Sequence, residues 1–199
     1  NLNEYFIFFQ PKDIVSGDFY WAGMLKNGNF ALVNADSTGH GVPGAIMSIL
    51  NISSIEKAVD EGLTEPSRIF NFTRKTIIER LNNDGSKEGG KDGMDASIIS
   101  FDFSVNKISY TAANNPIWLI RKDELIEFKP DKMPVGKHSN DAVSFTQGEF
   151  KLETGDLIYT LTDGFHDQFG GEKGKKFMSK KLKRLLLSMS NLPLDEQRK

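Results

Sequence analysis

The stretch Asn34-Ala35-Asp36-Ser37-Thr38-Gly39-His40-Gly41 joins two segments with different hydrophobic periods. Before it, Asn29 to Ala35 is a short apolar run typical of a strand. The turn Lys26-Asn27-Gly28 supplies the positive φ of a tight hairpin, so Asp18 to Leu25 is predicted to be the partner strand. After the stretch, Val42 to Val59 has a helical period. The stretch therefore marks the rim of a sheet, with an aspartate left at the edge where a strand gives way to a helix.

The remaining segments predict an α+β fold in which helices cover the faces of antiparallel sheets. A second helix is expected from about Thr64 to Leu81, and a last, amphipathic helix over Ser179 to Met189. The polar, glycine-rich stretch Asn82 to Gly93 is interpreted as a mobile loop. Short apolar runs between turn residues predict strands at Tyr5 to Gln10 (buried), Ala96 to Asp102, Lys107 to Thr111, Ile117 to Ile120, Leu125 to Lys129, Val143 to Leu152 and Leu157 to Thr162.

The composition is that of an ordinary globular protein. The chain has 199 residues, which is enough for one domain with a sizeable core. Its net charge of -2 gives no sign of nucleic-acid binding, and the absence of cysteine excludes disulfides, thiolate zinc sites and a cysteine nucleophile. The lack of cysteine also fits a reducing compartment, so we expect a cytoplasmic domain. No apolar run approaches the roughly 20 residues that span a bilayer, so a membrane anchor of the full-length protein would lie outside this segment. The chain starts at Asn1 instead of Met, which suggests a piece of a longer protein.

Three aspartates, Asp18, Asp36 and Asp163, stand at the ends of predicted strands, and Asp95 precedes a fourth strand. Each alone is explained as an ordinary turn residue. Together they would bring several carboxylates to one edge of a core, which is unfavourable unless cations neutralise them. Oxygen ligands favour Mg²⁺ or Mn²⁺ over zinc. Two such ions about 4 Å apart would activate a bridging water and hold phosphoryl oxygens, although spacing alone does not separate this chemistry from other metal chemistry.

Five segments occur in a distinctive order along the chain. They are Pro11 to Trp21 (PKDIVSGDFYW), Ala35 to Ala45 (ADSTGHGVPGA), Met94 to Ser97 (MDAS), Ala112 to Pro116 (AANNP) and Thr162 to Phe165 (TDGF). In this order they resemble the SpoIIE/RsbU branch of the PPM (protein phosphatase 2C-like) family, over nearly the whole chain. The resemblance implies one domain over residues 1–199, with an α/β/β/α sandwich of two antiparallel sheets flanked by helices.

The resemblance also implies an activity, which is hydrolysis of phosphoserine or phosphothreonine on a protein by a metal-activated water. The cofactor would be two Mn²⁺ or Mg²⁺ ions. Carried over by position, Asp36 would bridge the two ions, and the Ser37 carbonyl would complete one coordination shell. Asp18 would bind a metal directly or through water, and Asp163 would bind the second metal. Asp95 would support a third, more weakly held ion or a water.

Two departures from the family pattern affect the expected site. Members of this branch usually end with a strand that carries an Asp-Asp pair, whereas this chain ends in the polar stretch Leu194 to Lys199. Asp195 is a poor substitute, so the second metal site either receives a carboxylate from beyond Lys199 or is incomplete. His40 comes two residues later than the family histidine that is thought to protonate the leaving group. We interpret His40 as shaping the turn and capping the following helix.

Two functions from different classes stay open. The first is a phosphoprotein phosphatase in bacterial signalling. By the resemblance, its substrate would be a phosphorylated anti-sigma-factor antagonist and a sensor domain would precede it. The second is a catalytically inactive pseudophosphatase that acts as a binding module, which the missing Asp-Asp strand favours. A metal-dependent nuclease is disfavoured by the acidic balance, and the sequence leaves a homodimer open.

The segment Lys173 to Arg184 holds seven basic residues. We interpret it as the solvated face of the last helix, with Phe177, Leu182 and Leu185 pointing inward. The alternative is a surface that docks an acidic substrate.

Overall fold

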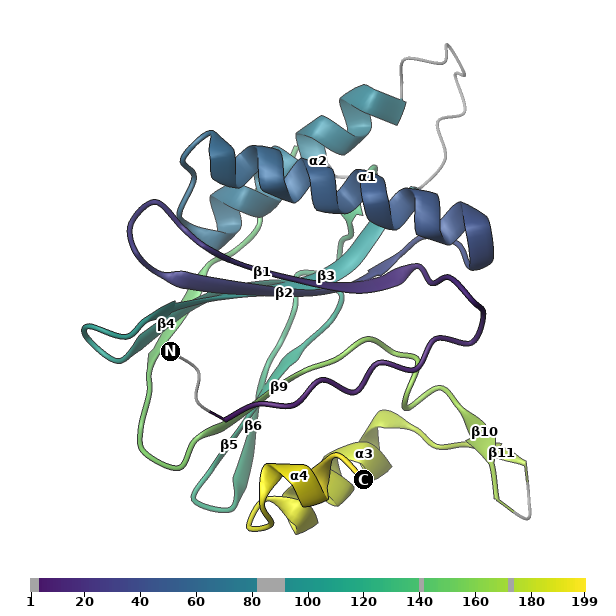
Figure 1. Cartoon of the computed structure of the whole chain (residues 1–199), viewed down its shortest axis with the longest axis vertical. Helices are drawn as coiled ribbons and strands as arrows, with labels where there is room; N and C mark the ends of the chain where they lie inside the picture. The colour runs from purple at the N-terminus through teal and green to yellow at the C-terminus, as the bar shows by residue number, and fades with distance from the viewer. Residues whose placement is uncertain (1–3, 82–91, 140–141, 172–173) are drawn as a thin grey trace.

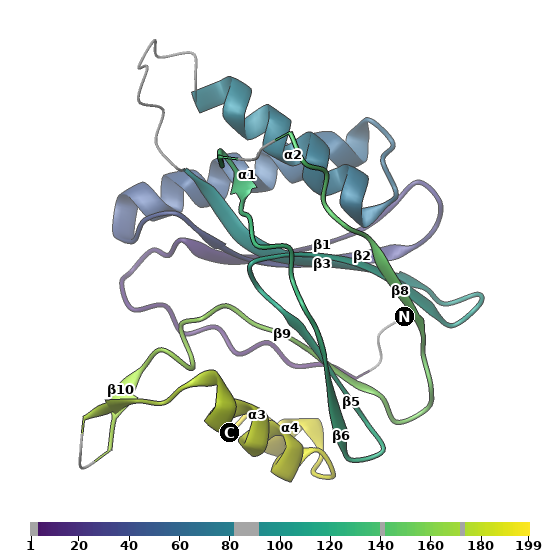
Figure 2. The same cartoon turned by 180° about the vertical axis from the view of Figure 1, so that it is seen from behind.

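The computed structural model describes residues 4–81, 92–139, 142–171 and 174–199. Helices α1 (Gly41–Asp60) and α2 (Pro66–Leu81) cover one face of a large sheet, and a smaller sheet lies on its other side (Figure 1). Helices α3 (Ser179–Met189) and α4 (Leu194–Gln197) lie on the outer side of the smaller sheet, as the view from behind also shows (Figure 2). The layers are therefore α/β/β/α, which confirms the predicted sandwich.

Both sheets are antiparallel. The larger sheet has the strand order β1-β2-β3-β4-β8, with β7 paired to β3, and the smaller has the order β6-β5-β9. Strands β10 and β11 form a separate hairpin. The bounds are β1 (Asp18–Met24), β2 (Phe30–Ser37), β3 (Gly93–Asp102), β4 (Lys107–Ala113), β5 (Ile117–Arg121), β6 (Glu124–Phe128), β7 (Val135–Gly136), β8 (Gly148–Lys151), β9 (Leu157–Thr160), β10 (Phe169–Gly170) and β11 (Lys175–Lys176).

The hairpin of β1 and β2 closes at the predicted Asn-Gly turn. Gly28 has a φ of 85°, a region that favours glycine, and its N–H donates to the Leu25 carbonyl at 2.9 Å. The Leu25 N–H donates to the Asn29 carbonyl at 2.8 Å. This turn fixes the register of the two strands, and the register later determines which side chains face each other at the open end of the hairpin.

Strand β3 lies between two hydrophobic cores. Successive residues of a strand point to opposite faces, so Ile98 packs under α1 and α2 while Ile99 packs between the two sheets. Ile55 of α1 and Ile77 of α2 are fully buried in the first core, and Ile117 of β5 is fully buried in the second. Because both faces are covered, β3 is a nearly continuous buried run, without the polar alternation of a half-exposed strand.

The predicted buried strand Tyr5 to Gln10 is wrong. This segment has no strand assignment, and Tyr5 and Phe8 are 68% and 50% exposed. An aromatic and β-branched run becomes a strand only when a neighbouring strand takes its backbone hydrogen bonds, and the described residues offer it no such neighbour. Local composition therefore favoured a strand, but the segment does not pair with either sheet.

Other boundaries differ from the predictions. Only Gly148–Lys151 of the predicted strand Val143 to Leu152 forms a ladder, and β3 starts at Gly93, before the predicted Ala96. Most of the predicted loop Asn82 to Gly93 lies outside the described residues. Helix α3 has the predicted bounds, with Leu182 buried, but Leu185 is 39% exposed and does not point inward as predicted. Within the described ranges, no helix combines the length and apolar character that a membrane span requires.

Candidate functional site

Three of the four predicted aspartates lie in one row across the larger sheet. The register pairs Asp18 of β1 directly with Asp36 of β2, and pairs Asp36 with Asp95 of β3. Directly opposed residues of antiparallel strands hold their Cβ atoms about 5 Å apart, and like charges in such pairs are destabilising. The fold therefore places three carboxyl groups side by side, an arrangement that does not stabilise the metal-free protein.

Asp163 approaches this row from the smaller sheet. It follows β9 in the loop that also holds Thr162, whose hydroxyl lies 3.4 Å from the Asp18 carboxylate. A Cβ on Gly164 would lie 3.9 Å from Asp18 Oδ2. Burial is the main cause that raises the pKa of Asp18, Asp36 and Asp95, and the charge of Asp163 adds to each shift. The four predicted aspartates therefore come from four separate strands or strand ends and interact electrostatically.

Burial and repulsion act most strongly on Asp36, in the middle of the row. Burial, followed by the charges of Asp18 and Asp163, raises the pKa of Asp36 to about 7. Burial also raises the pKa of Asp18, although a hydrogen bond with Asp36 opposes this shift. Burial likewise raises the pKa of Asp95, opposed by its hydrogen bond to Asn114. Simultaneous ionisation of all three carboxyl groups is therefore unfavourable near neutral pH.

Glycines allow α1 to begin directly beside the row. A Cβ on Gly17 would lie 2.9 Å from the Ser37 carbonyl oxygen and 2.7 Å from that of Gly39. A Cβ on Gly44, in the first turn of α1, would lie 2.5 Å from the same Gly39 oxygen. Gly39 itself has a φ of 95°, which favours glycine. The motif around Asp36 therefore folds tightly against the residue before Asp18, because three positions have no side chain.

A polar network that sequence reasoning missed fastens α1 to the ends of these strands. The Ser48 hydroxyl lies 2.7 Å from the Gly17 carbonyl, and Asn51 Nδ2 donates to the Ser37 hydroxyl at 2.9 Å. Ser48 and Asn51 are both buried, whereas the apolar Ile46 and Ile49 of the same helix are 61% and 69% exposed. The signal was present in the sequence as a stripe of small and polar residues at helical spacing, and α1 buries Gly44, Ser48, Asn51, Ser54, Ile55 and Ala58.

Two asparagines hold Asp95. Asn114 Nδ2 donates to the Asp95 carboxylate at 2.7 Å, and Asn115 Nδ2 donates to the Asp95 carbonyl at 2.9 Å. Asn114 has a φ of 57°, a left-handed conformation that asparagine tolerates better than most residues. The Asn114 amide thus orients the Asp95 carboxylate, and the Asn115 amide holds the backbone of the same residue.

His40 lies at the N-cap position of α1, but its side chain makes no capping hydrogen bond. The ring is 97% exposed, and its Nδ1 lies 4.0 Å from an oxygen of Asp13. His40 therefore caps α1 by position, as predicted, but its exposed side chain does not contribute a capping hydrogen bond. Its place in the turn, next to Gly39 and Gly41, agrees with the prediction.

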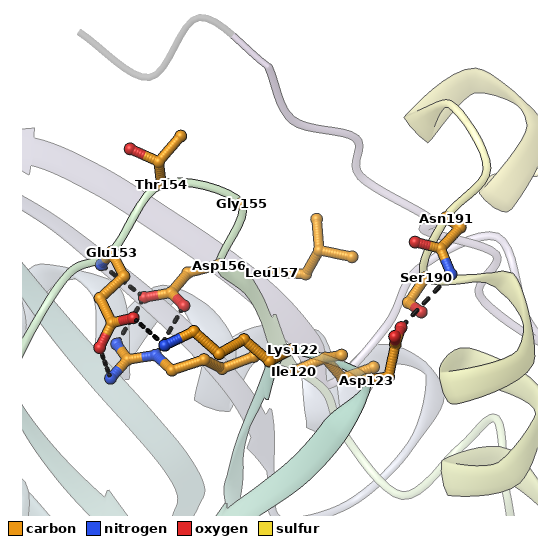
Figure 3. Close-up of a pocket in the computed structure, with 11 residues that line it drawn as sticks. Ile120, Lys122, Asp123, Glu153, Thr154, Gly155, Asp156, Leu157, Ser190 and Asn191 are labelled. Carbon is orange, nitrogen blue, oxygen red and sulfur yellow. Dashed lines mark hydrogen bonds and ion pairs between the residues drawn. The ribbon is translucent and has the colours of Figure 1, made fainter.

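The row opens into a hollow of ≈ 500 Å³ whose lining includes Asp36, Asp95, Asn114 and His40. A second hollow of ≈ 260 Å³ lies at the turn between β5 and β6 (Figure 3). There Arg121 pairs with Asp156 at 2.6 Å and with Glu153 at 2.8 Å, and Lys122 pairs with Glu153 at 3.0 Å. These groups neutralise each other, so the second hollow has the character of a structural ion-pair cluster, and the first is the candidate site.

The donor set of the first hollow fits a hard divalent cation. Carboxylate oxygens of Asp36 and Asp95 line this hollow, and Asp18 lies beside Asp36 in the sheet. Burial, followed by the charges of Asp18 and Asp163, raises the pKa of Asp36, and a cation would favour its ionised form. Among the described residues, no three acidic or histidine side chains already converge in metal-binding geometry. The backbone register nevertheless places the Cβ atoms of Asp18, Asp36 and Asp95 side by side on adjacent strands. Binding would then require rotation of these side chains.

Comparisons with known proteins agree with this geometry. The sequence model of the family described as Stage II sporulation protein E (SpoIIE) matches residues 26–198. Protein IcfG of Synechocystis is 28% identical over 180 residues, and the match spans 80% of this chain but only 28% of IcfG. The SiaA-PP2C domain of Pseudomonas aeruginosa is 28% identical with a TM-score of 0.83, covering 97% of this chain and 74% of that one.

A further solved structure supports the fold alone. The PP2C phosphatase domain of SpoIIE from Bacillus subtilis, with a fragment of its regulatory domain, is 20% identical with a TM-score of 0.67. The match covers 94% of this chain and 54% of that one. The row of aspartates, the sandwich and the match over residues 26–198 lead to one conclusion: the chain belongs to the SpoIIE family of PP2C-type phosphatases, in the SpoIIE/RsbU branch.

Proposed function

We propose that this chain is a divalent-metal-dependent phosphatase that removes phosphate from phosphoserine or phosphothreonine of a protein in bacterial signalling. One observation carries the proposal: Asp18, Asp36 and Asp95 stand in direct register across three strands, and Asp163 faces them from the other sheet. A structural role explains one aspartate at a strand end, but it does not explain four mutually repelling ones.

The residues suggest how two Mn²⁺ or Mg²⁺ ions would be held. Asp18, Asp36, Asp163 and the Ser37 carbonyl would hold the two ions, and Asp95 would hold a third, weaker ion or a water. When bound, such ions supply a water that is acidic enough to attack phosphorus near neutral pH. RsbX, which shares this fold at 16% identity and a TM-score of 0.58, has been crystallised with magnesium.

The protein part of the site supplies position and charge. The hydrogen bonds of Ser48 and Asn51 fix the adjoining ends of β1 and β2. The carboxylates of Asp18 and Asp36 on these strands therefore keep their spacing. Asn114 favours the ionised form of Asp95 by donating to it. The hollow is open to solvent, which suits a phosphorylated side chain on the surface of a protein better than an enclosed small molecule.

The partner that we propose is a phosphorylated anti-sigma-factor antagonist, and a sensor domain would precede the chain in its full-length protein. The RsbU and RsbW domains of a Mycobacterium tuberculosis protein share the fold at 20% identity and a TM-score of 0.70, and thus support the fold on which this proposal is based.

The test is hydrolysis of para-nitrophenyl phosphate with and without Mn²⁺. We expect turnover that requires the metal and that is abolished by Asp36→Asn and by Asp163→Asn. A matched control is Asp102→Asn, at the opposite end of β3 from Asp95, which should leave turnover unchanged. Absence of turnover with Mn²⁺ and also with Mg²⁺ would overturn the proposal.

A pseudophosphatase remains the second candidate because of two specific observations. Asp195 lies in the first turn of α4, and this helix is on the outer side of the smaller sheet (Figure 1). The described acidic side chains also do not form a preassembled metal cluster. Calorimetry separates the two functions: a chain that binds phosphopeptide but neither binds Mn²⁺ nor hydrolyses aryl phosphate is a binding module.

A further inference from the structure

A basic surface lies on hairpin β10–β11 and the start of α3. Residues 174–184 contain six basic residues and no acidic one, although the whole chain has a net charge of -2. Two of the six neutralise neighbours: Lys176 pairs with Asp167 at 2.5 Å, and Lys183 pairs with Glu127 at 2.8 Å. The four that remain are exposed and define the basic surface, namely Lys175, Lys180, Lys181 and Arg184.

These four residues make few interactions within the described part of the chain. Lys175, Lys180 and Arg184 form no ion pair there, and Lys181 only approaches the Phe177 ring, with its Nζ 5.8 Å from the ring centroid. Lys180 and Arg184 are four residues apart and so share one helical face. Solvation of an exposed helix explains scattered lysines, but it does not explain a segment from which every acidic residue is missing.

The charges are also unfavourable for α3 itself. Lys180 and Lys181 stand in its first turn, which has no acidic residue, and the N-cap residue Met178 makes no side-chain capping bond. The N-terminus of a helix carries a partial positive charge, so cations placed there destabilise it. The arrangement leaves a concentrated positive surface that an external anion would complement.

The basic surface is coupled to the candidate site through a short connection. The Asp167 N–H donates to the Asp163 carbonyl at 2.9 Å, and Lys176 holds the Asp167 carboxylate. The Phe177 N–H also donates to the Gln168 carbonyl at 2.9 Å, and this bond extends the pairing of the hairpin towards Asp163. The hairpin projects from the body of the molecule (Figure 1), and Phe169 at its edge is 76% exposed.

We propose that the basic surface docks an acidic region of the phosphoprotein substrate. The phosphate of that substrate would enter the hollow that Asp36 and Asp95 line. This inference depends on the proposed phosphatase function.

A phosphoprotein is favoured because the hairpin is joined to Asp163 through the Asp167 N–H and through Lys176. Phe169 and Met178 beside these cations are exposed, so a membrane is the alternative that the test separates. The net charge of -2 also disfavours nucleic acid. Docking would place a substrate beside a metal site that has few side chains of its own for specificity.

The test uses two phosphoserine peptides with the same core, one flanked by glutamates and the other by glutamines. We expect the whole chain with Mn²⁺ to hydrolyse the acidic peptide with about a tenfold higher kcat/KM, mainly through KM, and this preference should shrink as salt is raised. The variant Lys175→Glu/Lys180→Glu/Arg184→Glu should lose the preference while its hydrolysis of para-nitrophenyl phosphate stays unchanged.

A matched control reverses three exposed cations elsewhere, as Arg68→Glu/Lys75→Glu/Lys151→Glu, and it should keep the preference. Loss of preference in both variants, or in neither, would overturn the proposal, since the effect would then be general or absent. Binding of the whole chain to phosphatidylserine vesicles that disappears only in the first variant, without any peptide preference, would identify a membrane surface instead.

Failure of docking and failure of catalysis are separable. Fluorescence anisotropy of each labelled peptide with the protein, without metal, reports docking alone. Selective binding of the acidic peptide without hydrolysis of any substrate would support the basic surface and reject the phosphatase activity. Hydrolysis of both peptides at equal kcat/KM, with equal binding, would support the activity and reject the docking surface.

Discussion

Asp36 has a carboxylate on either side of it in the sheet, and this position has a measurable consequence in the absence of metal. Its pKa is about 7 in the folded chain and near 3.8 when unfolded, so the folded state binds more protons between these values. The free energy of unfolding should therefore fall as pH rises through this window. Asp18 and Asp95, whose pKa values are also raised, act in the same direction.

We predict that metal-free protein loses about 1–2 kcal/mol of stability between about pH 5 and pH 8, a value that allows for solvent screening of a half-buried group. Urea unfolding in the presence of a chelator measures this change. Asp36→Asn removes the titrating group and should flatten the dependence. The carboxyls with lowered pKa, such as Asp156, act only at lower pH and do not mask the effect. A wild-type profile as flat as that of the variant would contradict the raised pKa.

At the scale of elements, the start of α1 depends on the close approach of Gly44 to the loop around Gly39. We predict that Gly44→Ala lowers stability by about 1–3 kcal/mol, because the new Cβ would meet a backbone oxygen at 2.5 Å and the helix would have to shift. Helix propensity alone would make Gly44→Ala stabilising by about 1 kcal/mol. The sign of the change in stability therefore distinguishes steric overlap from propensity.

The matched control is Gly170→Ala in β10, where a Cβ would have no atom within 4 Å. Thermal unfolding of the two variants should differ, with a lower melting temperature only for Gly44→Ala. An unchanged or raised melting temperature for Gly44→Ala would mean that the loop yields easily and that the tight packing beside Asp36 is not required.

The same elements show how far sequence reasoning reached. The Asn27-Gly28 turn, the α1 bounds within one residue and the positions of Asp18, Asp36 and Asp95 at strand ends follow from local patterns, because turn chemistry and hydrophobic period are local. The burial of Ser48 and Asn51 and the exposure of Ile46 do not follow, since they depend on which strand ends the helix meets. The strand predicted at Tyr5 to Gln10 was wrong for a similar reason, because strand formation needs a neighbour.

For the whole molecule, a bound metal should act as a stabiliser of the fold. Asp36 lies on the larger sheet and Asp163 follows β9 of the smaller one, so a cation held by both would join the two sheets. We predict that Mn²⁺ at about 100 times its dissociation constant adds about 2.7 kcal/mol to the free energy of unfolding. Asp36→Asn should remove this gain, whereas Asp102→Asn should retain it. Equal stabilisation of both variants by Mn²⁺ would indicate binding elsewhere on the chain.

The position of β3 links the order of assembly to the site. Ile98 belongs to the core under the helices and Ile99 to the core between the sheets, so neither core is complete without this one strand. The strand also places Asp95 in the row, and its partners Asn114 and Asn115 follow β4. A chain that has packed only one of its cores therefore has no properly oriented set of carboxylates, and partly folded molecules would be unable to capture a cation before the sandwich closes.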